Sequence, residues 1–167
     1  GTMVGCPEVT LGVIPGAGGS QRAPRLAGIR ATLDLATTGK RIPAEEALEL
    51  GLVDRIEEGE PRALALQAAE DALSGALPVR RANELDTTPD DAALETFATS
   101  LARKAKNLFA PHKVVDAVAA STGPLAEGLV KERALFEECR GSPQRAGLIH
   151  AFFAERAVAK IPEADAE

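Results

Sequence analysis

The sequence has few aromatic residues. It contains no tryptophan and no tyrosine, and phenylalanine supplies all of its 3% aromatic content. With 45% hydrophobic residues and so few rings, the core has to be aliphatic and rich in alanine, which favours helices. At 167 residues the chain is long enough for one domain with a substantial core.

Cysteine is almost absent as well. Cys6 and Cys139 are the only two, and they have neither metal-ligand spacing nor a cysteine-rich context. We therefore expect two reduced thiols, no metal site and a cytoplasmic location. No apolar run is long enough to cross a bilayer and no signal peptide is visible, so we expect no membrane span.

Basic residues are outnumbered by acidic ones. The chain has 19 lysines and arginines against 25 aspartates and glutamates, which gives a formal net charge of -6 at pH 7. Nucleic acids and anionic membranes attract proteins through excess positive charge. The charge balance therefore excludes a general nucleic-acid or membrane-surface binder.

The chain does contain a lone acid followed by apolar residues and a glycine-rich turn. The apolar residues after Glu8 predict a short buried strand that starts at this acid; they are Val9, Leu11, Val13 and Ile14. Pro15 ends this predicted strand. The glycines that follow permit positive φ angles and close approach of another group to the backbone; they are Gly16, Gly18 and Gly19.

A helix is predicted to open at Ser20, with its free N–H groups facing the turn. An acid beside a helix N-terminus and a glycine turn is suited to moving a proton near a developing oxyanion. The alternative is a turn that serves tight packing only. A nucleotide-binding loop is excluded, because the Lys-Ser/Thr pair of a phosphate loop and the G-x-G-x-x-G register are both missing.

The rest of the chain is predicted to be mostly helical. Helices are expected over residues 20–37 with a break near Gly28, 43–50, 61–77, 92–110, 112–120, 125–138 and 142–160. The other segments are a strand over 52–56, a loop over 78–91 and a disordered acidic tail over 163–167. The predicted organisation is a core of residues 1–60 followed by a helical region of residues 61–162.

Several segments resemble the crotonase superfamily, also called the enoyl-CoA hydratase/isomerase superfamily. They follow one another in family order and comprise residues 7–22, 24–28 (PRLAG), 38–39 (TG), 42–47 (IPAEEA) and 51–54 (GLVD). Later segments are similar to the hydratase portions of multifunctional fatty-acid oxidation enzymes, in which the hydratase is fused to a 3-hydroxyacyl-CoA dehydrogenase. These segments are residues 132–136 (ERALF), Cys139, 142–144 (SPQ) and 152–156 (FFAER).

The resemblance implies an α/β fold of the ClpP/crotonase type, truncated to short strands followed by a mostly helical part. Family hydratases have an N-terminal half that supplies the oxyanion N–H groups, the other catalytic glutamate and most of the CoA-binding loop. Because this chain begins just before the second glutamate, we expect a C-terminal half without hydratase activity of its own. Residues 159–162 resemble the start of the linker to the dehydrogenase.

By this resemblance, Glu8 matches the second catalytic glutamate, the acid that delivers a proton to the α-carbon. The alternative is a partly buried acid that caps a local backbone N–H. The resemblance also implies that the glycine turn lies against the acyl thioester, with substrate-binding candidates Pro15, Gly16, Gly18 and Gly19. For Gly18 and Gly19, turn geometry alone is an equal alternative.

In the family, an aromatic residue and a cation on the final helix approach the CoA pantetheine and phosphate, often those of a neighbouring subunit. Phe153 and Arg156 are the candidates by position, and Phe136 is a weaker one. For Phe153 the alternative is a core position. For Arg156 it is a surface salt bridge with Glu155 or Glu132.

Two further basic sites have plain alternatives. Arg80 and Arg81 could contact a CoA phosphate, although a solvated surface pair is favoured. His112 has no carboxylate close in sequence and is predicted to be a surface residue.

The function that follows from the resemblance is hydration of 2-enoyl-CoA to 3-hydroxyacyl-CoA in fatty-acid β-oxidation, with acyl-CoA as substrate and no cofactor. Isomerase chemistry is not distinguished from hydration. The alternative is a non-catalytic oligomerisation or docking module derived from a crotonase. Exposed apolar surface predicts self-association, and a dehydrogenase domain after residue 162 is the expected covalent partner.

Overall fold

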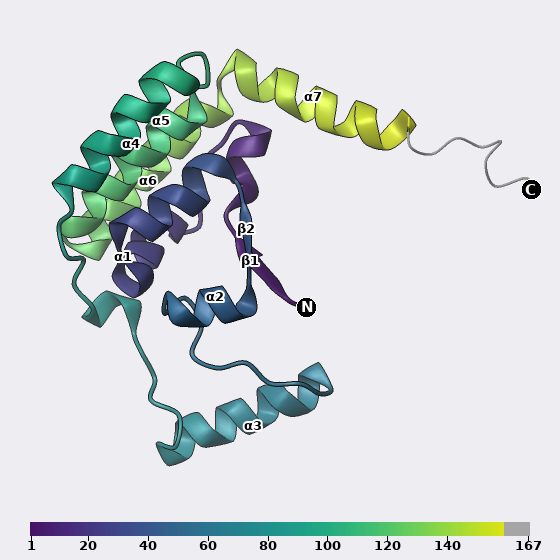
Figure 1. Ribbon diagram of the computed structural model, residues 1–167, viewed down its shortest axis with the longest axis vertical. Helices are drawn as coiled ribbons and strands as arrows, with labels where there is room; N and C mark the ends of the chain where they lie inside the picture. Colours follow the sequence, from purple (N-terminus) through teal and green to yellow (C-terminus); the bar gives the residue numbers. More distant parts are fainter. Residues whose placement is uncertain (159–167) are drawn as a thin grey trace, which may run out of the picture.

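The computed structural model describes residues 1–158. Helices dominate this part of the chain, and its one sheet has two short strands. The elements are β1 (Met3–Gly5), the 3-10 helix η1 (Pro7–Leu11), α1 (Gly19–Thr38), β2 (Arg41–Pro43), α2 (Ala44–Glu49), α3 (Pro61–Ser74), η2 (Ala82–Glu84), α4 (Asp91–Lys104), α5 (Ala110–Ala119), η3 (Ala120–Thr122), α6 (Leu125–Arg140) and α7 (Pro143–Val158). Figure 1 shows α1, α4, α5 and α6 lying together, with α3 and α7 extending away from them.

The main core forms where α1 packs on α5, with α4 and α6 beside them. Its buried residues are aliphatic, as the shortage of aromatics predicts, and they come from both predicted portions of the chain. They are Ile14, Ile29, Leu33 and Ala36, and then Ala93, Ala110, Val114, Ala117, Val118, Leu135 and Cys139. A smaller cluster of Leu35, Ile42 and Ala47 joins α1, β2 and α2.

The long helix α1 has the break that its glycine predicts. At Gly28 the backbone leaves the helical region, with φ 81° and ψ 165°, so two helical pieces meet there. Gly39 ends the second piece in the left-handed conformation, and its N–H donates to the Leu35 carbonyl at 3.0 Å. The predicted break and the predicted stop are both confirmed.

The strand predicted after Glu8 is wrong. Residues Pro7–Leu11 form η1 instead, and Gly12 ends it with a φ of 73°. Proline lacks an N–H and its φ is fixed near the helical value, so Pro7 suits the first turn of a helix. Two of the apolar residues that suggested a strand pack against the main core, Val9 from this short helix and Val13 from just after it.

The strand predicted over residues 52–56 is also wrong. This segment turns back on α2, where the Leu52 N–H donates to the Ala47 carbonyl at 2.8 Å. The sheet forms instead between β1 and β2, which pair antiparallel with Val4 opposite Ile42. Because β2 pairs with β1 in a sheet of only two strands, the segment after α2 has no strand partner among the described residues.

The helix predicted over residues 92–110 is too long. The structure ends α4 at Lys104 and starts α5 at Ala110, with Pro111 in its first turn. A proline inside a continuous helix would remove a hydrogen bond and clash with the preceding turn. The chain therefore begins a new helix at this proline, and Leu108 in the connection is exposed rather than buried.

The predicted helices before and after this region are confirmed, with small differences at their ends. α3 stops at Ser74, where Gly75 adopts φ 83°. The Ser142 hydroxyl accepts a hydrogen bond from the Arg145 N–H at 3.1 Å, which caps α7 as expected. The end of the last helix and the tail over 163–167 lie outside the described residues. Within residues 1–158, no helix combines the length and hydropathy that a membrane span needs.

Candidate functional site

Glu8 lies on η1 beside a pocket of about 270 Å³. The residues that line this pocket are Pro7, Glu8, Thr10, Leu11, Arg41, Phe152 and Arg156. The Glu8 Oε2 atom is buried and has no hydrogen-bond partner within residues 1–158. That oxygen therefore does not cap a local backbone N–H. A buried carboxyl oxygen without a protein partner, next to a cavity, can meet a ligand or a water.

The last helix supplies one wall of this pocket. The Arg156 guanidinium lies over the Phe152 ring, 3.4 Å from its centroid, so the cation and the aromatic form one unit. Phe153, the predicted aromatic, is 62% exposed and meets the Phe152 ring edge-on with centroids 5.4 Å apart. The structure thus places Arg156, a candidate for contact with CoA, at the same pocket as Glu8, and its aromatic neighbour there is Phe152 rather than Phe153.

The structure supports neither the core position considered for Phe153 nor the salt bridge considered for Arg156. Phe153 does not occupy a core position. Arg156 forms no salt bridge with Glu155 or Glu132 among the described residues. Glu132 is instead buried, with a side chain that is committed elsewhere.

The glycine turn is held by Glu132, a residue that the sequence reasoning weighed only as an ion-pair partner. One carboxyl oxygen accepts from the Gly18 N–H at 2.6 Å. The other accepts from the Ser20 N–H at 3.0 Å and from the Ser20 hydroxyl at 2.5 Å. The segment ERALF around Glu132 was part of the resemblance, but only the fold places this acid at the turn.

This contact corrects one prediction about the turn. The first N–H groups of α1 were expected to be free and to face the turn. Those of Gly18 and Ser20 already donate to the Glu132 carboxylate. A negative side chain at the helix N-terminus also offsets the positive end of the helix dipole. This end of α1 is therefore already occupied as an anion site.

Phe136 lies against the turn as well. A Cβ placed on Gly16 would collide with the Phe136 ring, so glycine is needed here for close packing. Phe136 in turn lies under the Arg133 guanidinium, 5.6 Å from the ring centroid. Gly16 and Phe136 therefore contact each other within the protein.

Pro15 and Gly19 complete a compact turn. Pro15 is buried, and a Cβ on Gly19 would lie 2.9 Å from the Pro15 Cβ. Gly18 has a φ of 88°, which is the left-handed conformation that glycine adopts without strain. None of the four predicted turn residues lines the pocket beside Glu8. Glu8 and the glycine turn are therefore close in sequence, but only Glu8 lines the pocket.

Both cysteines are reduced and have raised pKa values. Burial, together with the nearby Glu8 charge, raises the pKa of the Cys6 thiol to about 11. Burial also raises the pKa of Cys139 to about 11. Neither is suited to nucleophilic chemistry at neutral pH, because the thiolate is the reactive form. No cluster of three potential metal ligands occurs within residues 1–158.

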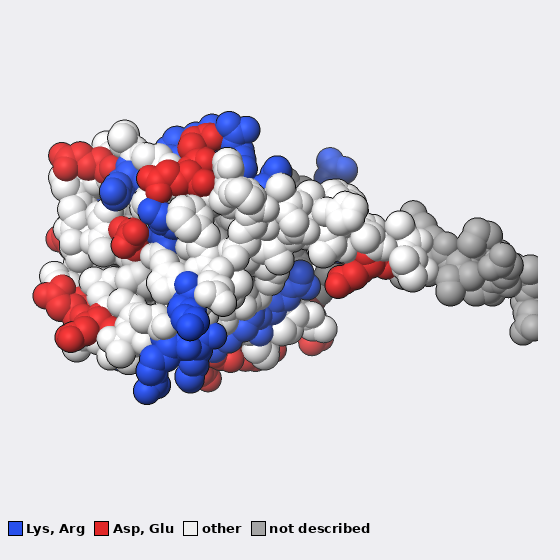
Figure 2. Space-filling model, turned by 90° about the horizontal axis from the view of Figure 1, so that it is seen from above, with Lys and Arg blue, Asp and Glu red and all other residues white. Residues whose placement is uncertain are grey.

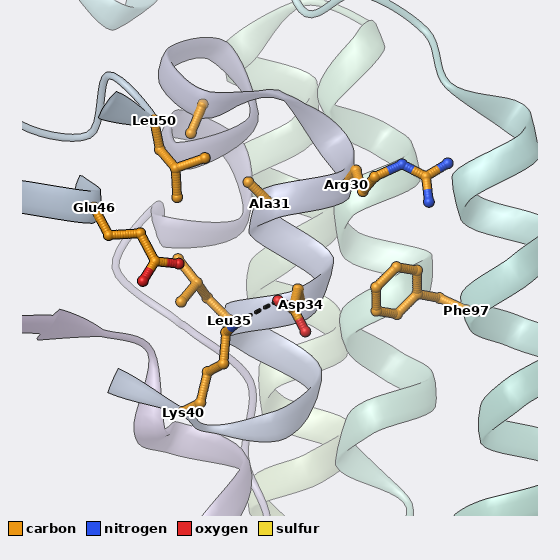
Figure 3. Close-up of a pocket in the computed structure, with 9 residues that line it drawn as sticks. Arg30, Ala31, Asp34, Leu35, Lys40, Glu46, Leu50 and Phe97 are labelled. Carbon is orange, nitrogen blue, oxygen red and sulfur yellow. Dashed lines mark ion pairs between the residues drawn. The ribbon is translucent and has the colours of Figure 1, made fainter. Parts of the chain in front are cut away.

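A second pocket of about 430 Å³ lies between α1, α2 and α4. Figure 3 shows charged side chains among the apolar side chains of Leu35, Leu50 and Phe97 in the lining of this pocket. Asp34 and Lys40 form an ion pair with each other across this pocket. None of the predicted site residues lines it.

Arg80 and Arg81 follow the favoured alternative of ion pairs at the surface, whereas His112, predicted to lie on the surface, is half-buried. Arg80 forms an ion pair with Asp54 at 2.6 Å, and Arg81 lies 3.7 Å from Glu84. The His112 Nε2 atom is 3.2 Å from the Ala105 carbonyl oxygen. Figure 2 shows basic and acidic side chains sharing one face of the molecule.

Comparison with known proteins identifies a family match. The family model described as "Enoyl-CoA hydratase/isomerase" matches residues 2–76, which include Glu8, the glycine turn, α1 and α2. Residues 2–76 thus match the enoyl-CoA hydratase/isomerase family, and this match supports the predicted crotonase-type fold class.

The relatives are named as multienzymes of fatty-acid oxidation. The peroxisomal bifunctional enzyme of Danio rerio is 42% identical over 161 residues, which are 94% of this chain and 22% of the relative. Fatty acid oxidation complex subunit alpha of Shewanella loihica is 38% identical over 164 residues, or 92% of this chain and 23% of the relative. The peroxisomal fatty acid beta-oxidation multifunctional protein AIM1 of Arabidopsis thaliana is 34% identical, over 96% of this chain and 23% of the relative. The chain thus spans about 22% of the length of the relatives it matches.

Proposed function

We propose that this chain supplies the Glu8 side of an enoyl-CoA hydratase site in a fatty-acid β-oxidation multienzyme. The family match and the names of the relatives support the class of reaction. The observation that carries the proposal is that Glu8 lines a pocket and that its buried Oε2 atom lacks a protein partner within residues 1–158.

In this reaction, water adds across the C=C bond of a 2-enoyl thioester. The water oxygen bonds to the β-carbon, the π electrons form a bond from the α-carbon to a proton, and no oxidant or cofactor is consumed. Glu8 is the acid that delivers the α-proton, and a second base takes the proton from water. A saturated 3-hydroxyacyl thioester results, and proton transfer from solvent restores Glu8.

The last helix provides the binding face for CoA in this proposal. Arg156 is a cation at the pocket rim, and its stacking on Phe152 holds the guanidinium in one orientation. A phosphate or the pantetheine amide groups suit these two side chains. The glycine turn of Pro15, Gly16, Gly18 and Gly19 is proposed to lie against the acyl thioester. Phe136 packs on this turn, and Phe153 supports Phe152 beside the pocket.

Partners and location also belong to the proposal. A 3-hydroxyacyl-CoA dehydrogenase domain is the proposed covalent partner, in agreement with the words "bifunctional" and "multifunctional" in the names of relatives. Self-association is proposed from the exposed apolar side chains of α3 and α7, such as Leu73 and Val158. A cytoplasmic location stays a proposal, because several relatives carry "peroxisomal" in their names.

The test is 2-enoyl-CoA hydration by the full-length protein that carries this sequence, with Glu8→Gln as the variant. Loss of the proton donor should lower kcat by roughly 10²- to 10⁴-fold with the fold intact. Glu49→Gln, an exposed acid on α2, is the matched control and should retain activity. Activity that survives Glu8→Gln would contradict the proposal and favour the alternative, a non-catalytic docking module. Assay of a 3-enoyl-CoA in parallel separates isomerisation from hydration.

A further inference from the structure

We propose that Glu132 is a positioning residue, through which α6 fixes the conformation of the glycine turn. The turn and this acid are 112 to 114 residues apart in the chain, yet three hydrogen bonds join them. The link from this geometry to acyl-CoA rests on the proposed function, whereas the positioning itself does not.

Both oxygens of the Glu132 carboxylate accept hydrogen bonds from the turn. Two backbone N–H groups and one hydroxyl, from Gly18 and Ser20, converge on the two oxygens of a side chain that is 2% exposed. Buried donors without a partner are costly, and hydrogen bonds to a charged acceptor are the stronger kind. An amide at this position offers one acceptor oxygen and one NH₂ group, so at least one donor of the turn would face another donor.

The register of α6 against the turn extends beyond this one residue. Gly128, Glu132 and Phe136 are spaced four apart and therefore share one face of α6. Along this face, residues later in α6 contact residues earlier in the turn. Gly128 contacts Gln21, Glu132 binds Ser20 and Gly18, and Phe136 covers Gly16.

Gln21 ties the same region to a third helix. Its Nε2 atom donates to the Ser20 hydroxyl at 3.0 Å and to the Ala117 carbonyl at 2.7 Å. Gln21 and Ser20 are fully buried, and a Cβ on Gly128 would collide with the Gln21 amide oxygen. The polar network thus joins α1, α5 and α6 at the point where the turn begins the helix.

This arrangement makes the turn a preformed surface. Its backbone conformation is set by protein contacts before any ligand arrives, and preorganisation lowers the entropic cost of binding. Loosening the turn should therefore weaken acyl-CoA binding and raise KM more than it lowers kcat, since Glu132 does not line the pocket that holds the proposed proton donor, Glu8.

The closing experiment compares Glu132→Gln with Glu127→Gln, an exposed acid on the same helix. Backbone amide exchange by NMR is expected to quicken at least tenfold at Gly18 and Ser20 in Glu132→Gln. Val114 on α5 and the control variant should keep the wild-type rates. Unchanged exchange at Gly18 and Ser20 in Glu132→Gln would overturn the positioning role. If Glu132→Gln does not fold, Ser20→Ala provides the same comparison with only the hydroxyl removed.

Calorimetric titration with octanoyl-CoA separates this inference from the proposed function. We expect the wild type to bind and Glu132→Gln to bind about tenfold more weakly, with the Glu127→Gln control unchanged. Equal affinity of wild type and Glu132→Gln would overturn the role in substrate binding. A wild type that does not bind octanoyl-CoA would count against the proposed function, while the exchange rates would still decide whether Glu132 positions the turn.

Discussion

The helices around the glycine turn and the two outlying helices are built in different ways. α1 and α5 carry many buried residues and share a continuous aliphatic core. α3 and α7 have no buried residue at all within the described chain. The glycine turn therefore belongs to the well-packed part of the molecule, whereas one wall of the pocket beside Glu8 is α7, a helix with no buried residue in the described chain.

The outlying helices depend on few contacts. α7 packs mainly on η1, the short helix that carries Glu8. α3 is tied to the segment before it by Asp71, which accepts a hydrogen bond from Arg55 at 2.5 Å and a second one, within the helix, from Gln67 at 2.8 Å. Segments with few buried apolar contacts open locally at low cost. Movement of α7 would open or close the pocket without disturbing the turn.

The largest expected difference between the two regions is in the cost of removing a leucine. Leu33→Ala in α1 should lower the free energy of unfolding by about 3 kcal/mol, because this side chain is fully buried. Leu73→Ala in α3 should change it by less than about 0.5 kcal/mol, because Leu73 is 89% exposed. Urea denaturation of both variants measures the difference, and equal costs would contradict the division into a rigid and an outlying part.

A smaller loss is expected from filling the space at Gly16. Gly16→Ala should destabilise the protein by about 2 kcal/mol, because the added methyl collides with the Phe136 ring. Gly147→Ala on α7 is the matched control and should be neutral or slightly stabilising, since nothing lies near its Cβ position.

The double variant Gly16→Ala with Phe136→Leu tests the contact directly. If the collision is the cause, the two changes should be less costly together than their sum, by roughly 1 kcal/mol. Additive effects in urea denaturation would show that Gly16 is not held by this ring.

Local rather than global loosening is expected from Asp71→Asn. Hydrogen bonds from Arg55 and Gln67 hold the pKa of Asp71 below its ordinary value of 3.8. A carboxyl whose folded pKa is lowered stabilises above its unfolded pKa, and that contribution is lost as the pH falls through the folded pKa. The tether of α3 should therefore persist from neutral pH down to 3.8 and fail below it.

Hydrogen exchange checks this tether. Asp71→Asn should quicken exchange along α3 at neutral pH and leave the urea midpoint of the whole protein unchanged. Glu70→Gln, its exposed neighbour, should have neither effect. A shift of the global midpoint by Asp71→Asn would show that α3 belongs to the main cooperative unit.

The smallest effect concerns the thiols. Cys6 and Cys139 have pKa values raised to about 11, so both are almost entirely protonated at neutral pH. Alkylation by iodoacetamide should be far slower than for a free cysteine, and it should accelerate in urea. Fast reaction of Cys139 in the native protein would show that the core around α5 and α6 opens readily.

Glycine and proline made part of this fold predictable. Gly28 and Gly39 mark the break and the end of α1, since their special backbone angles have a local cause. The strand predicted after Glu8 failed because an apolar run of that length fits a short helix as well as it fits a strand. Pro7 and Gly12, at the two ends of η1, were the local signals that favoured the short helix.

The site was predictable only where its residues lie in the matching segments. Glu8 and Arg156 were both named from the resemblance and line one pocket, although the sequence did not predict that they would meet. Phe153 was chosen over Phe152 because the sequence does not fix the rotation of the last helix to within one residue. Glu132 could not be assigned to the turn, because its partners are more than 110 residues away and only tertiary packing brings them together.

The most direct measurement is hydrogen–deuterium exchange of the chain with and without octanoyl-CoA. The account predicts that the ligand slows exchange in η1 and in α7 around Phe152 and Arg156, where the pocket has a weakly held wall. Gly18 and Ser20 should exchange slowly in both states, because Glu132 already holds them. Protection confined to regions other than η1 and α7, or a turn that exchanges as fast as α7 without ligand, would contradict it.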